Sequence, residues 1–224
     1  MAVIHHTTMQ PTKLELIAAW LPTRDWYTGR TEGPEPVKAG GFRLNDPAGE
    51  VGIEFMTVTD GTEEGALAYL VPMTYRGAPL EGAEHALICT SEHGVLGTRW
   101  IYDGAHDPVL VGQLYALLSG RAEAQDQSLD DTPDRTVSVF PAEGGDVSGA
   151  ASAELVRVVE GSDHTDAVVR VSGGEAGELA LRVRRVLRDA DEGDAPGLGR
   201  VIAEWRLPDG RTARGPYAVV EPVL

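Results

Sequence analysis

Lysine, cysteine and asparagine are almost missing from this 224-residue chain, which has two lysines (Lys13 and Lys38), one cysteine (Cys89) and one asparagine (Asn45). A single cysteine excludes an intramolecular disulfide and a metal site built from several cysteines. No apolar run is long enough to span a bilayer, and the N-terminus lacks the basic and apolar segments of a signal peptide. We therefore expect a soluble, cytoplasmic protein.

Positive charge is also scarce, because 19 Lys and Arg residues stand against 35 Asp and Glu, a formal net charge of -16. Nucleic acids and anionic membranes bind basic surfaces, so neither is an expected partner. The hydrophobic content of 42% is enough for a folded core in one large domain or two ordinary ones.

Apolar periodicity predicts a mixed α and β structure. Apolar residues at helical spacing predict a helix that begins near Pro11 and Thr12 and ends before Pro22. A second helix is expected after Asp107, which can cap it, with Pro108 in its first turn. Alternating apolar residues predict strands over 37–44, 51–55, 67–75, 86–89, 95–102, 136–140, 155–159, 167–171, 179–187, 200–207 and 217–223.

Residues 121–134 are rich in Glu, Gln, Asp and Ser and contain a single leucine, which is typical of a linker. We therefore predict an α+β domain over residues 1–120, an acidic linker over 121–134 and a mainly antiparallel β domain over 135–224.

The end of the first helix carries an unusual motif in which two adjacent aromatics follow a Leu-Pro pair. Its residues are Leu21, Pro22, Trp26, Tyr27, Gly29 and Arg30. This motif, with the later segment 99–104 and the helix after Asp107, resembles the N-terminal cap domain of actinobacterial maltokinases over residues 10–120. The resemblance implies a cystatin-like arrangement, a helix packed on a curved antiparallel sheet. Aromatics at such a junction usually pack in the core, so we expect Trp26 and Tyr27 to be structural.

The second half resembles the ATP-covering lobe of the same aminoglycoside-phosphotransferase-like kinases, over residues 155–187 and 201–224. Kinase chemistry needs a strand lysine, a helix glutamate, and a catalytic Asp with a metal-binding Asn. Arg182 stands at the lysine position, and His164 and Asp166 imitate a catalytic His-x-Asp in the wrong half. We therefore expect no kinase activity and no bound nucleotide cofactor.

Other catalytic and metal sites are weakly indicated. Cys89, Ser91 and His93 would share one face of a regular strand, but a buried cysteine near a surface histidine explains them better. Three histidines of the first half could converge on zinc, namely His85, His93 and His106. Three aspartates resemble a calcium loop but lack its closing glutamate, namely Asp189, Asp191 and Asp194. We expect no metal at either set.

A connecting segment with aromatic and polar groups is the strongest candidate for ligand binding. Its residues are Arg99, Trp100, Tyr102, Asp103 and His106. The four tryptophans could also stack on sugars, although core positions explain them as well.

Together, these observations predict that the protein is a non-catalytic interaction or regulatory module, linked by resemblance to glycogen, maltose or trehalose metabolism. The alternatives are a carbohydrate-binding module with exposed aromatics and an enzyme of unrecognised type. We expect a protein partner, such as an enzyme of carbohydrate metabolism, or self-association through the apolar C-terminal strand.

Overall fold

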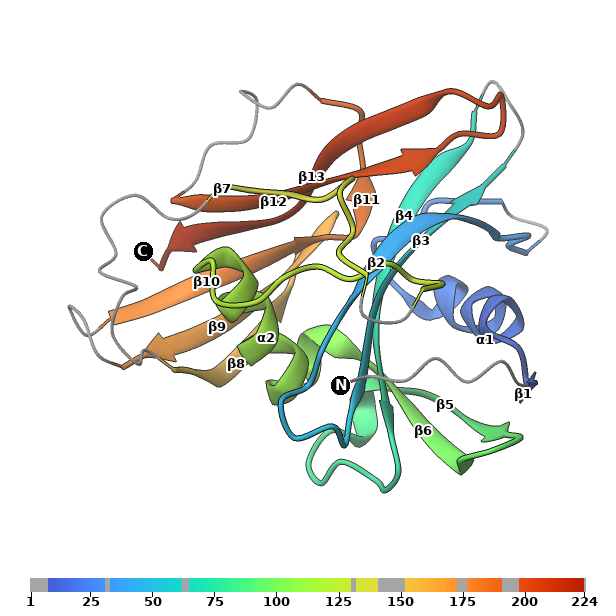
Figure 1. The fold of residues 1–224 in the computed structure, drawn as a ribbon. Coiled ribbons are helices and arrows are strands. Elements are labelled where there is room, and N and C mark those ends of the chain that lie inside the picture. The colour runs from blue at the N-terminus through green and yellow to red at the C-terminus, as the bar shows by residue number, and fades with distance from the viewer. Residues whose placement is uncertain are drawn as a thin grey trace.

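A single antiparallel sheet runs through the computed structural model, which describes residues 8–30, 33–61, 65–129, 132–140, 152–172, 177–190 and 198–223 (Figure 1). Its strands are β1 (Met9–Gln10), β2 (Val37–Leu44), β3 (Gly52–Asp60), β4 (Leu67–Arg76), β5 (Leu87–His93), β6 (Gly97–Asp103), β7 (Ser138–Phe140), β8 (Ala153–Glu160), β9 (His164–Val171), β10 (Gly177–Arg184), β11 (Val186–Leu187), β12 (Gly199–Arg206) and β13 (Thr212–Pro222). They lie in the order β1-β5-β6-β4-β3-β2-β12-β13-β10-β9-β8, with β11 beside β4 and β7 beside β12.

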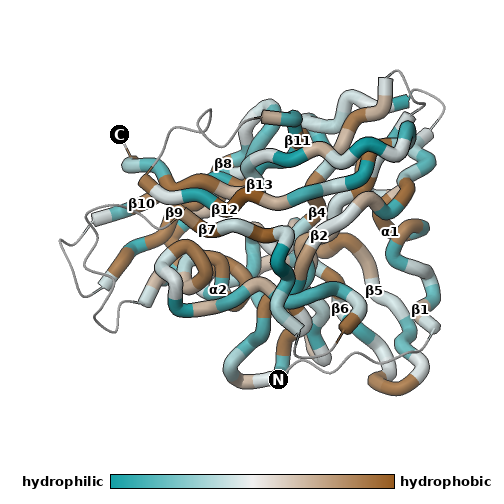
Figure 2. Tube along the Cα trace, turned by 45° about the horizontal axis from the view of Figure 1, so that its top comes forward, coloured by the Kyte–Doolittle hydropathy of each residue, from teal (hydrophilic) through white to brown (hydrophobic). Residues whose placement is uncertain are grey.

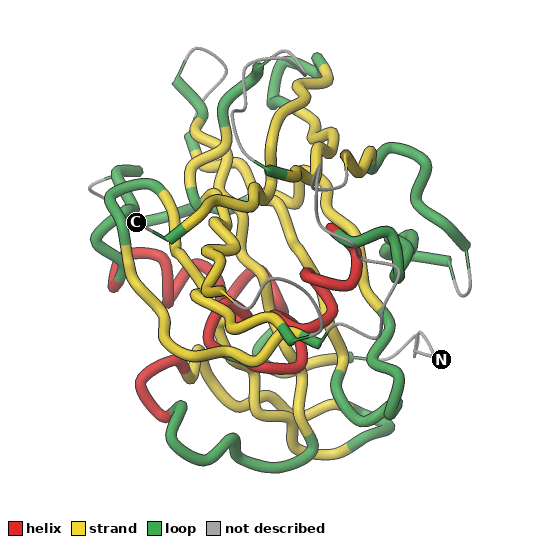
Figure 3. Tube along the Cα trace, turned by 90° about the vertical axis from the view of Figure 1, so that its left-hand side faces the viewer, coloured by secondary structure: helices red, strands yellow, loops and turns green. Residues whose placement is uncertain are grey.

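Two α-helices, α1 (Lys13–Trp20) and α2 (Pro108–Leu118), lie against the described strands, as Figure 3 shows from the side. Three short 3₁₀-helices, η1 (Leu21–Thr23), η2 (Glu84–Ala86) and η3 (Gly104–His106), connect the elements. The predicted α+β class, with a helix on a large antiparallel sheet, is confirmed.

The predicted start of α1 is confirmed by its N-terminal cap. The Glu15 backbone N–H donates to Thr12 Oγ1, and the Thr12 backbone N–H donates to the Glu15 carboxylate at 2.8 Å. These reciprocal bonds satisfy two donors that a helix start otherwise leaves unpaired. The helix ends at Trp20, where η1 with Pro22 begins.

Strands β3 and β4 are buried on both faces, which explains their nearly continuous apolar sequences. One face packs against α1 in a cluster that includes Ile17, Met56 and Val71. The opposite face packs against α2 in a larger cluster that includes Phe55 and Leu114. Figure 2 shows brown, hydrophobic positions on α2 and on the strands beside it.

The two aromatics of the motif after α1 pack at this helix–sheet junction, with Trp26 buried and Tyr27 half-buried, whereas Pro22 and Arg30 are exposed. Trp26 is 2% exposed and meets the Trp20 ring edge-on, with ring centroids 5.6 Å apart. The Tyr27 hydroxyl donates to Asp60 at 2.6 Å. A Cβ at Gly29 would lie 2.2 Å from the Tyr27 hydroxyl oxygen, so only glycine fits there. The observed burial agrees with the expected packing role of the motif.

Lys13 also fastens α1 to the sheet through a buried carboxylate on β3. Lys13 Nζ lies 2.6 Å from Glu54 Oε2, and the Tyr75 hydroxyl donates to the same oxygen at 2.6 Å. Gln127 donates to the other carboxylate oxygen at 3.1 Å. Because all three partners donate, Glu54 is held as an ionised group.

The two halves of the chain share one sheet and one core. Strand β2 meets β12 at Gly40 and Trp205, and a Cβ on Gly40 would lie 3.0 Å from the Glu204 carbonyl oxygen. The larger core cluster includes side chains from both halves, among them Phe42 and Tyr217. The division into two domains stays a prediction. In the structure, the two predicted domains share one sheet and one hydrophobic core.

The segment 121–134, expected as a linker, is partly packed where the structure describes it. Gln125 is buried and exchanges backbone hydrogen bonds with Arg43, and Ala124 joins the larger core cluster. Composition did not reveal these contacts.

Two details of the second half differ from expectation. The single strand expected over residues 179–187 is two strands, β10 and β11. Strand β10 pairs with β9 as far as Arg184, and after Arg185 the chain pairs with β4 instead. The C-terminal strand, expected to leave apolar surface uncovered, lies inside the sheet between β12 and β10. Asp209 and Gly210 lie in the turn between β12 and β13, where the Gly210 backbone N–H donates to the Leu207 carbonyl at 2.9 Å.

Among the described residues, neither α-helix has the length and apolar character that a membrane-spanning helix needs.

Candidate functional site

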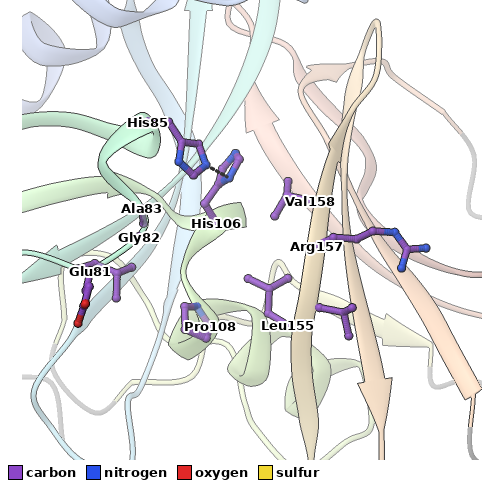
Figure 4. Close-up of a pocket in the computed structure, with 11 residues that line it drawn as sticks. Glu81, Gly82, Ala83, His85, His106, Pro108, Leu155, Arg157 and Val158 are labelled. Carbon is purple, nitrogen blue, oxygen red and sulfur yellow. Dashed lines mark hydrogen bonds between the residues drawn. The ribbon is translucent and has the colours of Figure 1, made fainter.

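A groove of about 360 Å³ lies between the two halves of the chain, alongside β8 (Figure 4). One wall comes from residues 80–83 with His85 and His106, and the other comes from residues 155–158 of β8. Pro108, the first residue of α2, also lines it. Among the described strands, β8 pairs only with β9, so it forms an edge of the sheet.

Local backbone geometry fixes η3 and therefore His106. The Asp103 carboxylate accepts from the Ala105 backbone N–H at 3.2 Å, which caps η3. A Cβ at Gly104 would lie 2.2 Å from Leu110 Cδ1, so any larger residue there would require the Leu110 side chain to move.

Asp107 holds the start of α2 next to this turn. Its carboxylate accepts from the Val109 backbone N–H at 2.9 Å, which caps the helix as predicted. It also accepts two hydrogen bonds from Arg76 at the end of β4, both at 2.6 Å. This ion pair, in which Asp107 is fully buried and Arg76 is partly exposed, ties α2 to the sheet.

A chain of hydrogen bonds begins in the groove and ends in the protein interior. His85 Nε2 lies 3.2 Å from His106 Nδ1, and His106 Nε2 lies 3.1 Å from Glu160 Oε1. Thr165 donates to Glu160 Oε2 at 2.7 Å and accepts from Arg185 Nε at 2.7 Å. The chain therefore links η2 and η3 of the first half to β8 and β9 of the second.

Arg185 ends this chain and is fully buried. Its Nη2 donates to both Asp103 carboxylate oxygens, at 2.8 and 2.6 Å, and its guanidinium carbon lies 5.3 Å from the centroid of the Trp26 ring. The Arg185 carbonyl accepts from the Leu70 backbone N–H at 3.0 Å. Arg185 thus connects β4, the end of β6 and the aromatic motif.

Glu160 is ionised over the whole physiological pH range. Partial burial alone would raise its pKa, but hydrogen bonds from His106 and Thr165 and the nearby Arg185 charge lower the pKa to about 2. The groove therefore offers an imidazole that is oriented by a carboxylate. None of the described residues lining it is Ser, Thr, Cys, Tyr or Lys, so the groups in this lining that could act as nucleophiles are the two imidazoles and the Glu81 carboxylate. The geometry is suited to binding.

Residues 20–107 match the family model of the maltokinase N-terminal cap domain. The match confirms the resemblance found in the sequence. It contains the motif after α1 and both groove histidines, and it ends at the residue that caps α2. Glu160 and Arg185 lie outside it, so the second half completes the hydrogen-bond chain that begins in the cap domain.

The structure separates the five residues of the predicted binding segment. His106 lines the groove. Asp103 is held by Arg185, and the buried Tyr102 accepts at its hydroxyl from the Leu80 backbone N–H at 2.9 Å. On β6 of the cap domain, Arg99 donates to the Leu96 carbonyl at 2.8 Å and Trp100 packs near Tyr102. Only His106 is thus placed at the groove.

The tryptophans do not form an exposed platform for sugars. Trp20, Trp26 and Trp205 are buried in core clusters, and Trp100 is half-buried. Stacking on a sugar needs an accessible ring face, which the three buried rings lack.

Cys89, Ser91 and His93 do not form a nucleophile and its base. Ser91 is buried and donates to the Pro11 carbonyl at 3.0 Å, whereas His93 Nδ1 accepts from two backbone N–H groups of its own hairpin. Burial raises the pKa of the Cys89 thiol, which disfavours the reactive thiolate.

The structure brings two of the three predicted histidines together, His85 and His106, while His93 lies opposite Met9 at the far end of β5. Of the aspartates compared with a calcium loop, Asp191 and Asp194 lie outside the described residues. Asp189 accepts from the Arg214 backbone N–H.

The kinase-like positions are occupied by ion pairs. Arg182 forms two hydrogen bonds of 2.8 Å to Asp166 on β9 and an ion pair of 2.8 Å to Glu221 on β13. His164 contacts Asp163 at 2.8 Å instead of a substrate site. Two carboxylates therefore hold the Arg182 guanidinium, the group predicted to stand at the kinase lysine position.

Sequence reasoning missed Glu160, Thr165 and Arg185 as site residues. The only signal was the adjacent pair Arg184 and Arg185, which breaks the alternation of the strand. Such a break indicates that one of the two arginines points inward and needs a buried partner.

Proposed function

We propose that the chain is a non-catalytic interaction or regulatory module of maltose, trehalose or glycogen metabolism, located in the cytoplasm. The cap-domain match over residues 20–107 supports the metabolic setting. The cap domain would have the cystatin-like arrangement that the family resemblance implies. The observation that carries the interaction role is the groove beside an edge strand, which is lined by apolar residues such as Leu155 and Val158 and by the contacting pair His85 and His106.

The groove suits an extended peptide segment of a partner protein. An edge strand offers one row of unpaired backbone N–H and C=O groups to which another strand can be added. On β8, Val156 is 37% exposed and Val159 is 49% exposed, and Leu155 and Val158 line the groove. The partner segment would pair with β8 and place alternate apolar side chains in the groove. We propose an enzyme of carbohydrate metabolism as its source.

The same features support a role without catalysis. The Arg182 guanidinium is held by the Asp166 and Glu221 carboxylates, and none of the described residues lining the groove is Ser, Thr, Cys, Tyr or Lys. The carbohydrate-binding alternative stays a prediction that no feature of the groove favours, because the buried tryptophans leave it without an aromatic wall.

Site-specific photo-crosslinking in the organism of origin tests the proposal. A photoreactive amino acid at Val156 or Val159 should crosslink to an enzyme of maltose, trehalose or glycogen metabolism. Val37 is 62% exposed on β2 and is the matched control, at which this adduct should be missing. Adducts at Val37 alone, or no enzyme adduct at β8, would overturn the proposed surface. A turnover measured with the purified chain would overturn the non-catalytic role.

A further inference from the structure

Two imidazole nitrogens face each other at the head of the groove (Figure 4). His85 comes from η2 and His106 from η3, and the distance between Nε2 of the first and Nδ1 of the second is 3.2 Å. Two nitrogens bound to one tetrahedral zinc ion at about 2.05 Å would lie roughly 3.3 Å apart. The two rings are thus already spaced as two ligands of one ion.

We propose that His85 Nε2 and His106 Nδ1 bind a transition-metal ion of the zinc class. Imidazole nitrogens suit Zn²⁺, Ni²⁺ and Cu²⁺, whereas Mg²⁺ and Ca²⁺ prefer oxygen ligands. The ion would take the place of the proton that the two nitrogens share in its absence.

Glu160 prepares His106 for this role. Its carboxylate oxygen lies 3.1 Å from His106 Nε2 and accepts a hydrogen bond from the N–H at that position. The neutral imidazole then carries its lone pair on Nδ1, which faces His85. A carboxylate behind a ligating histidine is a common feature of metal sites because it fixes the tautomer and the ring orientation.

A nearby set of groups is less suitable for the ion. Ligand atoms of Asp103, His106 and Glu160 lie within 4.8 Å of one another. However, Arg185 Nη2 is 2.6 Å from the Asp103 carboxylate, and this guanidinium is always charged. The Arg185 charge would repel a cation bound beside Asp103 at close range. In the hydrogen-bond chain, Thr165 and the Glu160 carboxylate separate Arg185 from His106.

Two protein ligands leave coordination positions for water or for a group of a bound partner. Figure 4 shows the carboxylate of Glu81 and the guanidinium of Arg157 pointing away from the two imidazoles. We therefore expect binding in the micromolar range, weaker than at a closed structural site with four protein ligands.

Calorimetric titration with Zn²⁺ tests the proposal. The full chain should carry His5→Ala and His6→Ala, because these adjacent histidines could bind metal themselves. Zn²⁺ should bind with 1:1 stoichiometry and Mg²⁺ should not. His85→Ala should weaken Zn²⁺ binding at least tenfold, and so should His106→Ala. Glu160→Gln should weaken it by about 10–100-fold, the usual effect of losing such a carboxylate.

His93→Ala and His164→Ala are the matched controls, and both should bind Zn²⁺ as the parent does. Long-range ¹H–¹⁵N NMR should show Zn²⁺ shifting His106 Nδ1 while Nε2 keeps its proton. Absence of 1:1 binding would overturn the proposal. Unchanged Zn²⁺ binding in His85→Ala would also overturn it, because the ion would then be bound by the alternative set of Asp103, His106 and Glu160.

Discussion

Arg185 and Asp103 are 82 residues apart in the sequence, yet Arg185 Nη2 lies 2.6 Å from Asp103 Oδ2, and both side chains are buried. The pair joins the end of β6 to the point where the chain passes from β10 to β11. A buried charge is tolerated only with a partner, so the two residues depend on each other.

Arg185→Leu should therefore destabilise the protein by about 3–5 kcal/mol, because it leaves the Asp103 carboxylate buried without its cation. Urea unfolding followed by circular dichroism would measure the loss. The double variant Arg185→Leu/Asp103→Leu should recover a large part of it. Arg211→Leu, which breaks an exposed ion pair with Asp209, is the control and should leave the urea midpoint nearly unchanged. Equal effects of the two single arginine substitutions would refute the buried role.

Trp26→Ala should cost about 3–5 kcal/mol, since it removes a large buried ring and leaves a cavity between Trp20 and Tyr69. Thermal and urea unfolding would show it. Trp100→Ala is the comparison, because that ring is only half-buried, and its effect should be smaller. If Trp26→Ala unfolds like the parent, the motif has no packing role.

Stability should fall below about pH 4.5. Burial alone would raise the pKa of Glu54, but the charge of Lys13 and its hydrogen bond, together with Tyr75, lower the pKa below the ordinary 4.5. A depressed folded-state pKa contributes stability above the unfolded value and loses it as pH falls through the folded value. Glu160, with a pKa lowered to about 2, acts in the same direction. Urea midpoints from pH 7 to pH 3 should decline more gently in Glu54→Gln, and an unchanged slope would contradict this assignment.

Neither the chain nor Arg182→Lys should bind ATP with magnesium, because Asp166 and Glu221 would hold the new ammonium as they hold the guanidinium. Calorimetry with Mg²⁺ and ATP would check this. A magnesium-dependent affinity in the micromolar range for either protein would show that the chain has a working nucleotide site.

Local features of the fold were predictable from the sequence and long-range ones were not. The strand Val37–Leu44 and the cap of α2 at Asp107 follow from alternation and from capping chemistry, which act over a few residues. The place of β13 between β12 and β10 depends on which strands pair, and no local pattern encodes that choice. For the same reason the exposed C-terminal strand was the wrong expectation.

The site was predictable to a similar extent. His85 and His106 were candidates by residue type, but their convergence depends on the hairpin of β5 and β6 and on η3. Glu160 reaches His106 only because β8 lies beside the cap domain, a contact between residues 54 apart. Charge and residue type alone could not place that carboxylate behind the imidazole.

The pairing of β2 with β12 has a consequence for synthesis on the ribosome. Strand β2 is translated before β3–β11, and its neighbour β12 is translated only after them. Until then the β2 edge and the inner face of its sheet have no covering strand, and uncovered edges invite pairing with other nascent chains. Gly40 and Gly41 lie in β2, and the register shift between Lys38 and Gly40 makes this strand irregular. An irregular edge disfavours pairing with other chains before β12 is made.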